Sequence, residues 1–272
     1  MMLKLFQIDA FTTKVFGGNP AAVMPLDSWL PDAVMQNIAL ENNLSETAFF
    51  VKSGEGLYQL RWFTPTAEVD LCGHATLASS WVIFHHLAPQ LSRVQFETRS
   101  GILTVERGAG ETLRMSLPAA SLSAFAAPDG FEANIGAALG VPPPREVHIG
   151  KVHMIAVWDD ADTIKAIQLG NLAPVLRAVG IWGLICTAGG PTAAPYDFIS
   201  RFFAPDKGVP EDPVTGSAHC ALVPFWSQRL NKKTLRARQI SARGGDILCT
   251  DEGARVMLEA SCAPYMVGEI EI

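Results

Sequence analysis

The chain has 272 residues, of which 49% are hydrophobic and 18% are charged, and its formal net charge is −6 at pH 7. This size is enough for one large domain, or for two of ordinary size, with a buried core. The acidic balance argues against a nucleic-acid partner and against an anionic membrane surface, since both attract a basic face, and no apolar run approaches the roughly 18 residues that a membrane helix needs.

The cysteine usage points to a reducing compartment. None of the five cysteines belongs to a CxxC pair or to a Cys/His ligand spacing, which argues against a zinc site and against a disulfide framework. The opening segment MMLKLFQIDAFTT has no long apolar stretch and predicts a strand rather than a signal peptide. We therefore expect a cytoplasmic protein without a bound metal. The cysteines are Cys72, Cys186, Cys220, Cys249 and Cys262.

In chain order after the first strand, a helix is expected over residues 31–42, with a proline at its start. The runs YQLRWF and GILTVER are typical of strands. A second helix is predicted over residues 75–87, directly after the polar triplet Cys72-Gly73-His74. Its composition is apolar nearly all round, and this predicts a helix buried on all sides.

The second half follows the same scheme. Short helices are expected over residues 134–139 and 171–179, and a longer one over residues 218–230. The longer helix is again apolar on most of its surface and follows a glycine, Gly216.

The two halves resemble one another. LRWFTPTAEVDLCGHATLASSW in the first half parallels SRFFAPDKGVPEDPVTGSAHCALVPFW in the second, so that Arg61 corresponds to Arg201 and Gly73 to Gly216. The similarity continues further along each half, where FETRSGILTVERG in the first half parallels ISARGGDILCTDEG in the second. A period this long indicates duplicated domains rather than a solenoid.

We therefore predict two similar α+β domains, residues 1–118 and 119–272, with the seam in the Ala-, Ser- and Pro-rich stretch 117–130. In each, a sheet wraps round one central helix. A pseudo-twofold axis relating the domains would bring both glycine turns to one interdomain cleft, where ligand sites commonly form.

Gly73-His74 and Gly216-Ser217 each stand at a predicted helix N-terminus. The unpaired N–H groups there carry a partial positive charge, and glycine lets a ligand approach the backbone. For a single copy, an ordinary strand-to-helix turn would be the favoured interpretation. Two copies favour a small carboxylated substrate.

Glu46 lies between a polar turn and an apolar strand in ENNLSETAFF. It is either a surface carboxylate, the usual fate of Glu, or an acid–base group whose proton affinity is raised by desolvation against the domain core. The sequence leaves both open.

Three further residues have two interpretations each. Asp212 either caps a turn before Pro213 or accepts hydrogen bonds from a substrate. His74 is a core histidine or a hydrogen-bonding group, whose neutral form is favoured at a helix N-terminus. Cys72 is a buried structural thiol or an activated one. His219 is assigned to packing.

These segments resemble a known family. FTTKVFGGNPAAV, NLSETAF, RWFTPTAEVDLCGHAT and EDPVTGSAH are similar, in order and spacing, to the signature segments of the phenazine-biosynthesis PhzF-type isomerases, and the similarity runs over essentially the whole chain. The resemblance implies a diaminopimelate epimerase-like fold: two similar domains, each a mostly antiparallel sheet rolled round a central helix. It also implies a homodimer that uses no metal or organic cofactor.

Carried over to this sequence, the resemblance implies that Glu46 is the acid–base residue. In the namesake reaction a proton moves between ring carbons of trans-2,3-dihydro-3-hydroxyanthranilate. His219 and Cys220 stand where small residues are common in the family, which leaves the shape of the pocket, and so the substrate, undefined. The substrate-binding residues that the resemblance implies are His74, Gly73, Asp212, Gly216, Ser217 and, in the GGNP turn, Asn19.

The duplication also constrains the mechanism. Related epimerases use two cysteine bases, one per domain; here Cys72 holds the first position, but Thr215 holds the second, and threonine is a poor proton acceptor. The stretch corresponding to Glu46, IWGLICT, has Cys186 as its sole ionisable side chain. One carboxylate on one face predicts an allylic proton shift rather than an inversion. The alternatives are an epimerase that uses Cys72 with another group, and a binding protein without turnover.

Overall fold

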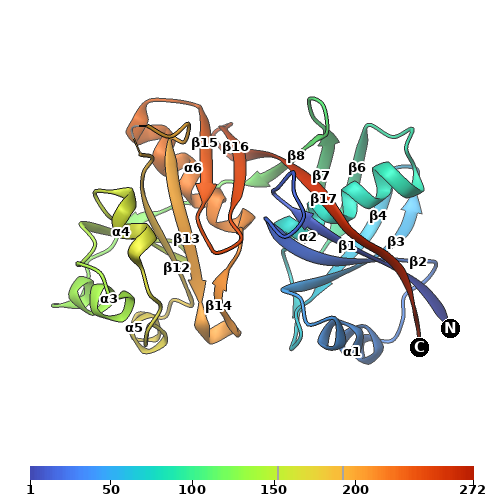
Figure 1. Ribbon diagram of the computed structural model, residues 1–272, viewed down its shortest axis with the longest axis horizontal. Coiled ribbons are helices and arrows are strands. Elements are labelled where there is room, and N and C mark those ends of the chain that lie inside the picture. The colour runs from blue at the N-terminus through green and yellow to red at the C-terminus, as the bar shows by residue number, and fades with distance from the viewer. Residues whose placement is uncertain (152, 192) are drawn as a thin grey trace. The chain divides into compact units, whose positions relative to one another are not determined.

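The computed structural model describes residues 1–151, 153–191 and 193–272, and the chain divides into two compact units. The first contains Met1–Leu117 and Met257–Ile272, and the second contains Pro118–Val256. The predicted second domain, 119–272, is therefore wrong at its C-terminal end. The last strand, β17 (Arg255–Glu271), leaves the second unit and pairs antiparallel with β1 (Met2–Ala10), so that the red and blue ends of the ribbon run side by side in Figure 1.

The first unit is a sheet of eight strands that closes on itself. Each strand pairs with the next in the order β1, β2, β3, β4, β6, β7, β8, β17, and β17 returns to β1. The two-residue strand β5 (Glu68–Val69) pairs with β4 outside this ring. The other strands are β2 (Asn19–Leu26), β3 (Glu46–Gly54), β4 (Leu57–Phe63), β6 (Arg93–Thr98), β7 (Gly101–Arg107) and β8 (Thr112–Pro118).

Helix α2 (Gly73–Val82) packs against β1, β2 and β3, and all ten of its residues are buried. It begins two residues before the predicted start, and the final turn, Ile83–Leu87, is π-helical. Its hydroxyl groups donate to carbonyls one turn back: Ser79 Oγ to Ala75 O at 2.7 Å and Ser80 Oγ to Thr76 O at 2.8 Å. A helix packed on every side can carry these serines because each hydroxyl is satisfied within the helix itself.

Helix α1 (Asp32–Asn42) covers the other face of this sheet. Met35, Ile38 and Ala39 form its buried stripe and pack with side chains of β2 and β3, among them Met24 and Phe49.

The second unit repeats the order of pairings found in the first. In the second unit β10–β11 is antiparallel, β11–β12 parallel, β12–β13 antiparallel, β13–β15 parallel and β15–β16 antiparallel. The first unit has the same alternation in the pairs β1–β2, β2–β3, β3–β4, β4–β6 and β6–β7. Its elements are β9 (Ser123–Ala124), α3 (Phe131–Leu139), β10 (Glu146–Ile149), β11 (His153–Val157), α4 (Ala161–Ala166), α5 (Ala173–Arg177), β12 (Gly183–Gly189), β13 (Phe198–Ala204), β14 (Val209–Asp212), α6 (Gly216–Leu230), β15 (Thr234–Gln239) and β16 (Gly245–Asp251).

The sheets are mixed rather than wholly antiparallel, and the helices explain where the parallel pairs fall. Parallel neighbours need a long crossover, usually helical. In the first unit α1 connects β2 to β3, and α2 lies between β4 and β6; in the second, α4 and α5 connect β11 to β12, and α6 lies between β13 and β15. Each of these strand pairs is parallel.

The repeat extends to side chains. Arg61 makes two hydrogen bonds with Glu68, both of 2.7 Å, and its Cζ lies 5.1 Å from the centre of the Phe63 ring. Arg201 bonds Glu211 in the same way, at 2.7 and 2.9 Å, and lies 5.1 Å from the Phe203 ring. The matched contacts support the correspondence between the halves that the sequence indicates.

Pro224 interrupts the hydrogen bonding of α6, because a proline has no N–H to donate to the carbonyl four residues earlier. The Cys220 carbonyl accepts instead from the Ala120 N–H at 2.9 Å, which fastens the segment after β8 to this helix. No helix in the described part of the chain has the length and apolar character required to span a bilayer.

Candidate functional site

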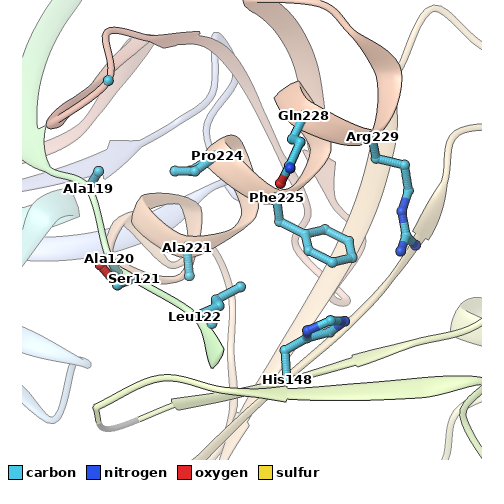
Figure 2. Close-up of a pocket in the computed structure, with 11 residues that line it drawn as sticks. Ala119, Ala120, Ser121, Leu122, His148, Ala221, Pro224, Phe225, Gln228 and Arg229 are labelled. Atoms are coloured by element: carbon cyan, nitrogen blue, oxygen red, sulfur yellow. The ribbon is translucent and has the colours of Figure 1, made fainter. Parts of the chain in front are cut away.

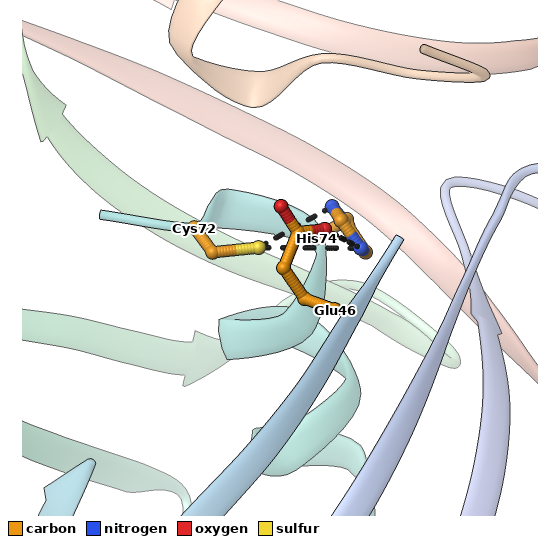
Figure 3. A group of neighbouring side chains, drawn as sticks. All are labelled: Glu46, Cys72 and His74. Carbon is orange, nitrogen blue, oxygen red and sulfur yellow. Dashed lines mark hydrogen bonds and ion pairs between the residues drawn. The ribbon is translucent and has the colours of Figure 1, made fainter. Parts of the chain in front are cut away.

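Three of the predicted site residues meet in the first unit (Figure 3). Glu46 Oε2 lies 3.1 Å from His74 Nε2, and Cys72 Sγ lies 3.4 Å from His74 Nδ1 and 4.0 Å from Nε2. The imidazole thus stands between a carboxylate and a thiol. Cys72 and His74 are buried, whereas the Glu46 side chain keeps 17% of its surface exposed.

The backbone explains why these side chains converge. Glu46 is the first residue of β3 and lies opposite Ala21 of the parallel neighbour β2. Cys72 is the N-cap of α2, with extended backbone angles (φ −143°, ψ 110°), and His74 is the second residue of the helix. A strand start and a helix start are therefore held together by the closed sheet. Gly73, between Cys72 and His74 in the chain, is the first helical residue and is buried.

Asn19 joins the cluster from a third segment, the start of β2. Its Nδ2 lies 3.2 Å from His74 Nδ1, and its side chain is fully buried. The loop before it contains two non-glycine residues with positive φ, Phe11 (65°) and Phe16 (69°), and Gly18, where a Cβ would come within 2.0 Å of the Ala10 carbonyl oxygen. Such backbone is uncommon outside sites that need a fixed geometry.

The charges in this cluster are coupled. Burial, together with the nearby Glu46 carboxylate, raises the pKa of the Cys72 thiol to about 11. Burial alone would lower the pKa of His74, but the Cys72 sulfur and the Glu46 carboxylate outweigh it and raise this pKa well above its ordinary value. Because Cys72 remains a neutral thiol at pH 7, the Glu46 carboxylate is the charge that holds the imidazolium.

This arrangement corrects the expectation of a neutral His74. The helix N-terminus does disfavour a cation, but a carboxylate at 3.1 Å is a stronger effect than a partial helix charge. When His74 is protonated, Nδ1 donates, and the Asn19 amide must then be turned so that Oδ1, in place of the Nδ2 that lies 3.2 Å away, accepts from it.

The remaining predicted residues lie in the second unit. Thr215, the N-cap of α6, donates from its hydroxyl to Asp212 Oδ2, and its N–H donates to Gln239 Oε1 at 2.9 Å. Gln239 Nε2 donates to the Asp212 carbonyl at 2.7 Å. Gly216 is buried at the start of the helix and Ser217 half-buried. Gln239, fully buried, was not predicted, because a lone glutamine at a strand end has no local signal.

The position that corresponds to Glu46 is occupied by Gly183. Thr47 pairs with Phe63 in one unit and Leu184 with Phe203 in the other, which makes residues 46 and 183 equivalent. A Cβ on Gly183 would come within 2.8 Å of the rings of His153 and Phe202. No side chain fits there, so the second unit has no counterpart of the Glu46 carboxylate.

Two other ionisable groups of the second unit are removed from proton transfer. Cys186 is fully buried in an apolar cluster, and burial raises the pKa of its thiol far above the ordinary value. His219 places Nδ1 at 2.8 Å from the Thr215 carbonyl, within α6, and burial lowers its pKa to about 4. This is the packing role expected for it.

A cavity of about 540 Å³ lies elsewhere in the second unit, between α6 and the segment Ala119–Leu122 (Figure 2). None of the predicted site residues lines it. Its Arg229 and His148 are paired with Glu146, at 2.7 and 3.0 Å, and the Arg229 contact is the largest cause of a Glu146 pKa lowered to about 2. Volume alone does not outweigh the chemistry of Glu46, His74 and Cys72.

Within the described residues, the same three side chains also form a group with the ligand types and spacing that suit a metal ion. One ligand atom from each of Glu46, Cys72 and His74 lies within 4.8 Å of the other two.

Comparison with known proteins shows which family the chain is similar to. The family model described as phenazine biosynthesis-like protein, PhzC/PhzF, matches residues 8–261. A protein of Pseudomonas aeruginosa named as an uncharacterized isomerase is 47% identical, with all of both chains covered. The crystal structure of a PhzF-family protein from Enterococcus faecalis is 41% identical and superposes with a TM-score of 0.91, again over all of both chains.

A more distant structure shares the fold alone. A hydroxyproline epimerase from Agrobacterium vitis is 10% identical and has a TM-score of 0.60, with 99% of this chain and 92% of that chain covered. From the family match and the close relatives, the chain belongs to the phenazine biosynthesis-like PhzC/PhzF family and is an isomerase.

Proposed function

We propose that the protein moves a proton between two carbons of a small carboxylic acid and that Glu46 is the acid–base residue. The observation that carries this is the Glu46–His74 contact of 3.1 Å at a partly open carboxylate. His74, as imidazolium, holds Oε2, while the other oxygen faces the substrate.

In this mechanism the Glu46 carboxylate takes a proton from one carbon, and the electron pair of that C–H bond forms a new double bond as the old one shifts. The carboxylic acid then returns the proton to the far carbon on the same face. The proton balance is zero, and no configuration is inverted. The start of α2 at Gly73 stabilises the substrate carboxylate or the charge that develops.

The second half is proposed to bind rather than to transfer protons. Asp212 orients polar groups of the substrate, with its carboxylate positioned by Thr215, and Gly216-Ser217 supply N–H and hydroxyl donors. The absence of a side chain at Gly183 supports a single base. We also propose the homodimer that the family resemblance implies, to be tested by light scattering.

Deuterium incorporation from heavy water tests the base. With trans-2,3-dihydro-3-hydroxyanthranilate, or with a small carboxylic acid that raises the melting temperature, wild-type protein is expected to exchange the transferred proton. Glu46→Gln is expected to lose at least about 100-fold of this exchange, because general acid–base catalysis contributes that much. Glu41→Gln, at an exposed carboxylate, is the control. Undiminished exchange in Glu46→Gln would refute the assignment.

Substitution of Cys72 distinguishes this proposal from a one-cysteine epimerase. The contact with His74 at 3.4 Å favours an activated thiol, but a pKa of about 11 leaves it protonated. We expect Cys72→Ser to retain exchange. Loss of exchange in Cys72→Ser together with retention in Glu46→Gln would establish the one-cysteine mechanism instead.

A further inference from the structure

The donor atoms of Glu46, Cys72 and His74 form a set that suits one class of metal ion. A carboxylate oxygen, an imidazole nitrogen and a sulfur are the ligands of Zn²⁺ and of Co²⁺ in tetrahedral sites. They belong to two rigid elements, the first residue of β3 and the first turn of α2, so that their spacing is set before any metal arrives.

The distances come close to those of a bound site. With metal–ligand bonds of about 2.0–2.3 Å, neighbouring ligand atoms of a tetrahedral zinc site lie roughly 3.3–3.7 Å apart. Here Nε2 is 3.1 Å from Glu46 Oε2 and 4.0 Å from Cys72 Sγ, and all three atoms lie within 4.8 Å of one another. A small rotation of the Cys72 side chain closes the set.

A second observation points to the same place. Glu46 Oε2 is buried, and its ion-pair partner is His74 Nε2 at 3.1 Å. Once the imidazolium loses its proton to solvent, this buried carboxylate oxygen has lone pairs available for a cation. Asn19, at 3.2 Å from Nδ1, supplies the outer partner that ligating histidines usually have.

We propose that Glu46, Cys72 and His74 bind a single Zn²⁺ reversibly and that the bound ion inhibits the isomerase. The thiol and imidazolium protons leave to solvent as Sγ and Nε2 bind, and Nδ1–H then donates to the Asn19 amide oxygen. The fourth position is taken by water on the exposed side of Glu46. Inhibition follows because the carboxylate that accepts the substrate proton becomes a ligand, and this part rests on the proposed function.

Cobalt titration tests the binding without any substrate. Wild-type protein is expected to bind one equivalent of Co²⁺, with the visible bands of a tetrahedral ion and a near-ultraviolet thiolate-to-cobalt band. Cys72→Ser is expected to lose the thiolate band, and Cys72→Ser, Glu46→Gln and His74→Gln are each expected to weaken binding by ~10- to 100-fold or more. Cys262→Ser, at a thiol outside the cluster, is the matched control.

Circular dichroism of each variant establishes that the fold is kept, and the three variants alter two elements, the start of β3 and the first turn of α2. The site is overturned if wild-type protein shows no thiolate band, if the band persists in Cys72→Ser, or if all variants bind Co²⁺ equally. Proton exchange with and without Zn²⁺, restored by EDTA, tests inhibition separately. If neither Glu46 nor Cys72 takes part in proton transfer, the cobalt spectra remain and the inhibition is absent. If Cys72 is the base, the inhibition remains, and the exchange assays of Cys72→Ser and Glu46→Gln identify that base.

Discussion

At the scale of single residues, three buried histidines illustrate how surroundings set charge. His74 faces the Glu46 carboxylate and has a raised pKa. His153 is 8% exposed and lies between the rings of Trp182 and Phe202, and His219 is fully buried within α6. Burial lowers the pKa of both to about 4. The first imidazole is held as a cation and the other two as neutral bases.

Because His153 and His219 are neutral in the folded protein, we expect the free energy of unfolding to decrease in acid. A folded pKa of about 4, below the ordinary 6.5, means that the unfolded chain binds protons more readily between these values. The contribution of these two histidines to stability is therefore constant above pH 6.5 and falls as the pH drops toward 4, by up to about 3 kcal/mol for each histidine. Urea unfolding at several pH values measures this.

His153→Phe is expected to remove about half of that loss, since the ring keeps its aromatic contacts without titrating. The control is His86→Gln, at an exposed histidine, which should leave the pH dependence as in wild type. An acid loss of equal size in His153→Phe would contradict the attribution to His153.

At the scale of elements, α2 combines complete burial with polar side chains. Leu77, Ala78 and Trp81 pack as apolar groups, while Ser79 and Ser80 bond to the helix's own carbonyls. The hydroxyls therefore contribute little to tertiary specificity, whereas their small volume allows strands to approach on every side.

Ser79 tests this. Ser79→Ala is expected to change the free energy of unfolding by no more than about 1 kcal/mol, because the acceptor carbonyl keeps its helical N–H bond. Ser79→Leu is expected to cost about 1–3 kcal/mol or more through overpacking. Denaturant unfolding distinguishes the two, and a tolerated leucine would show that the helix is less tightly enclosed than its burial indicates.

At the scale of the whole molecule, the closed sheet of the first unit depends on the end of the chain. β17 pairs with β8 and with β1, in a register that runs from Cys262–Ala10 to Glu271–Met2 and shifts by one residue at Tyr265. The strand that completes the ring round α2 thus comes more than 100 residues after the rest of the unit.

Deleting residues 264–272 is expected to abolish cooperative unfolding of the first unit. Removal of the strand leaves the N–H and C=O groups of β1 without partners and opens one side of α2. Differential scanning calorimetry would measure the lost transition. Tyr265→Ser keeps the backbone pairing and should retain it, since this ring is half exposed. A truncated chain with an unchanged transition would contradict the role of β17.

Much of the architecture follows from local pattern. The strand YQLRWF, the buried helix after Gly73 and the echo of both in the second half are visible because periodicity and glycine placement act over short distances. The pairing of Arg61 with Glu68 is likewise a local event, and it recurs as Arg201 with Glu211.

The sequence by itself therefore determined the duplicated plan, the buried helices that follow the turns at Gly73 and Gly216, and the family resemblance that makes Glu46 the predicted base. The tertiary structure alone decided that Glu46 and Asn19 both contact His74. It also decided that Gln239 links Asp212 to Thr215, and that β17 pairs with β1. These contacts join segments far apart in the chain, and the charge of His74 depends on them. No local pattern encodes a long-range register, because it arises only when the sheet closes.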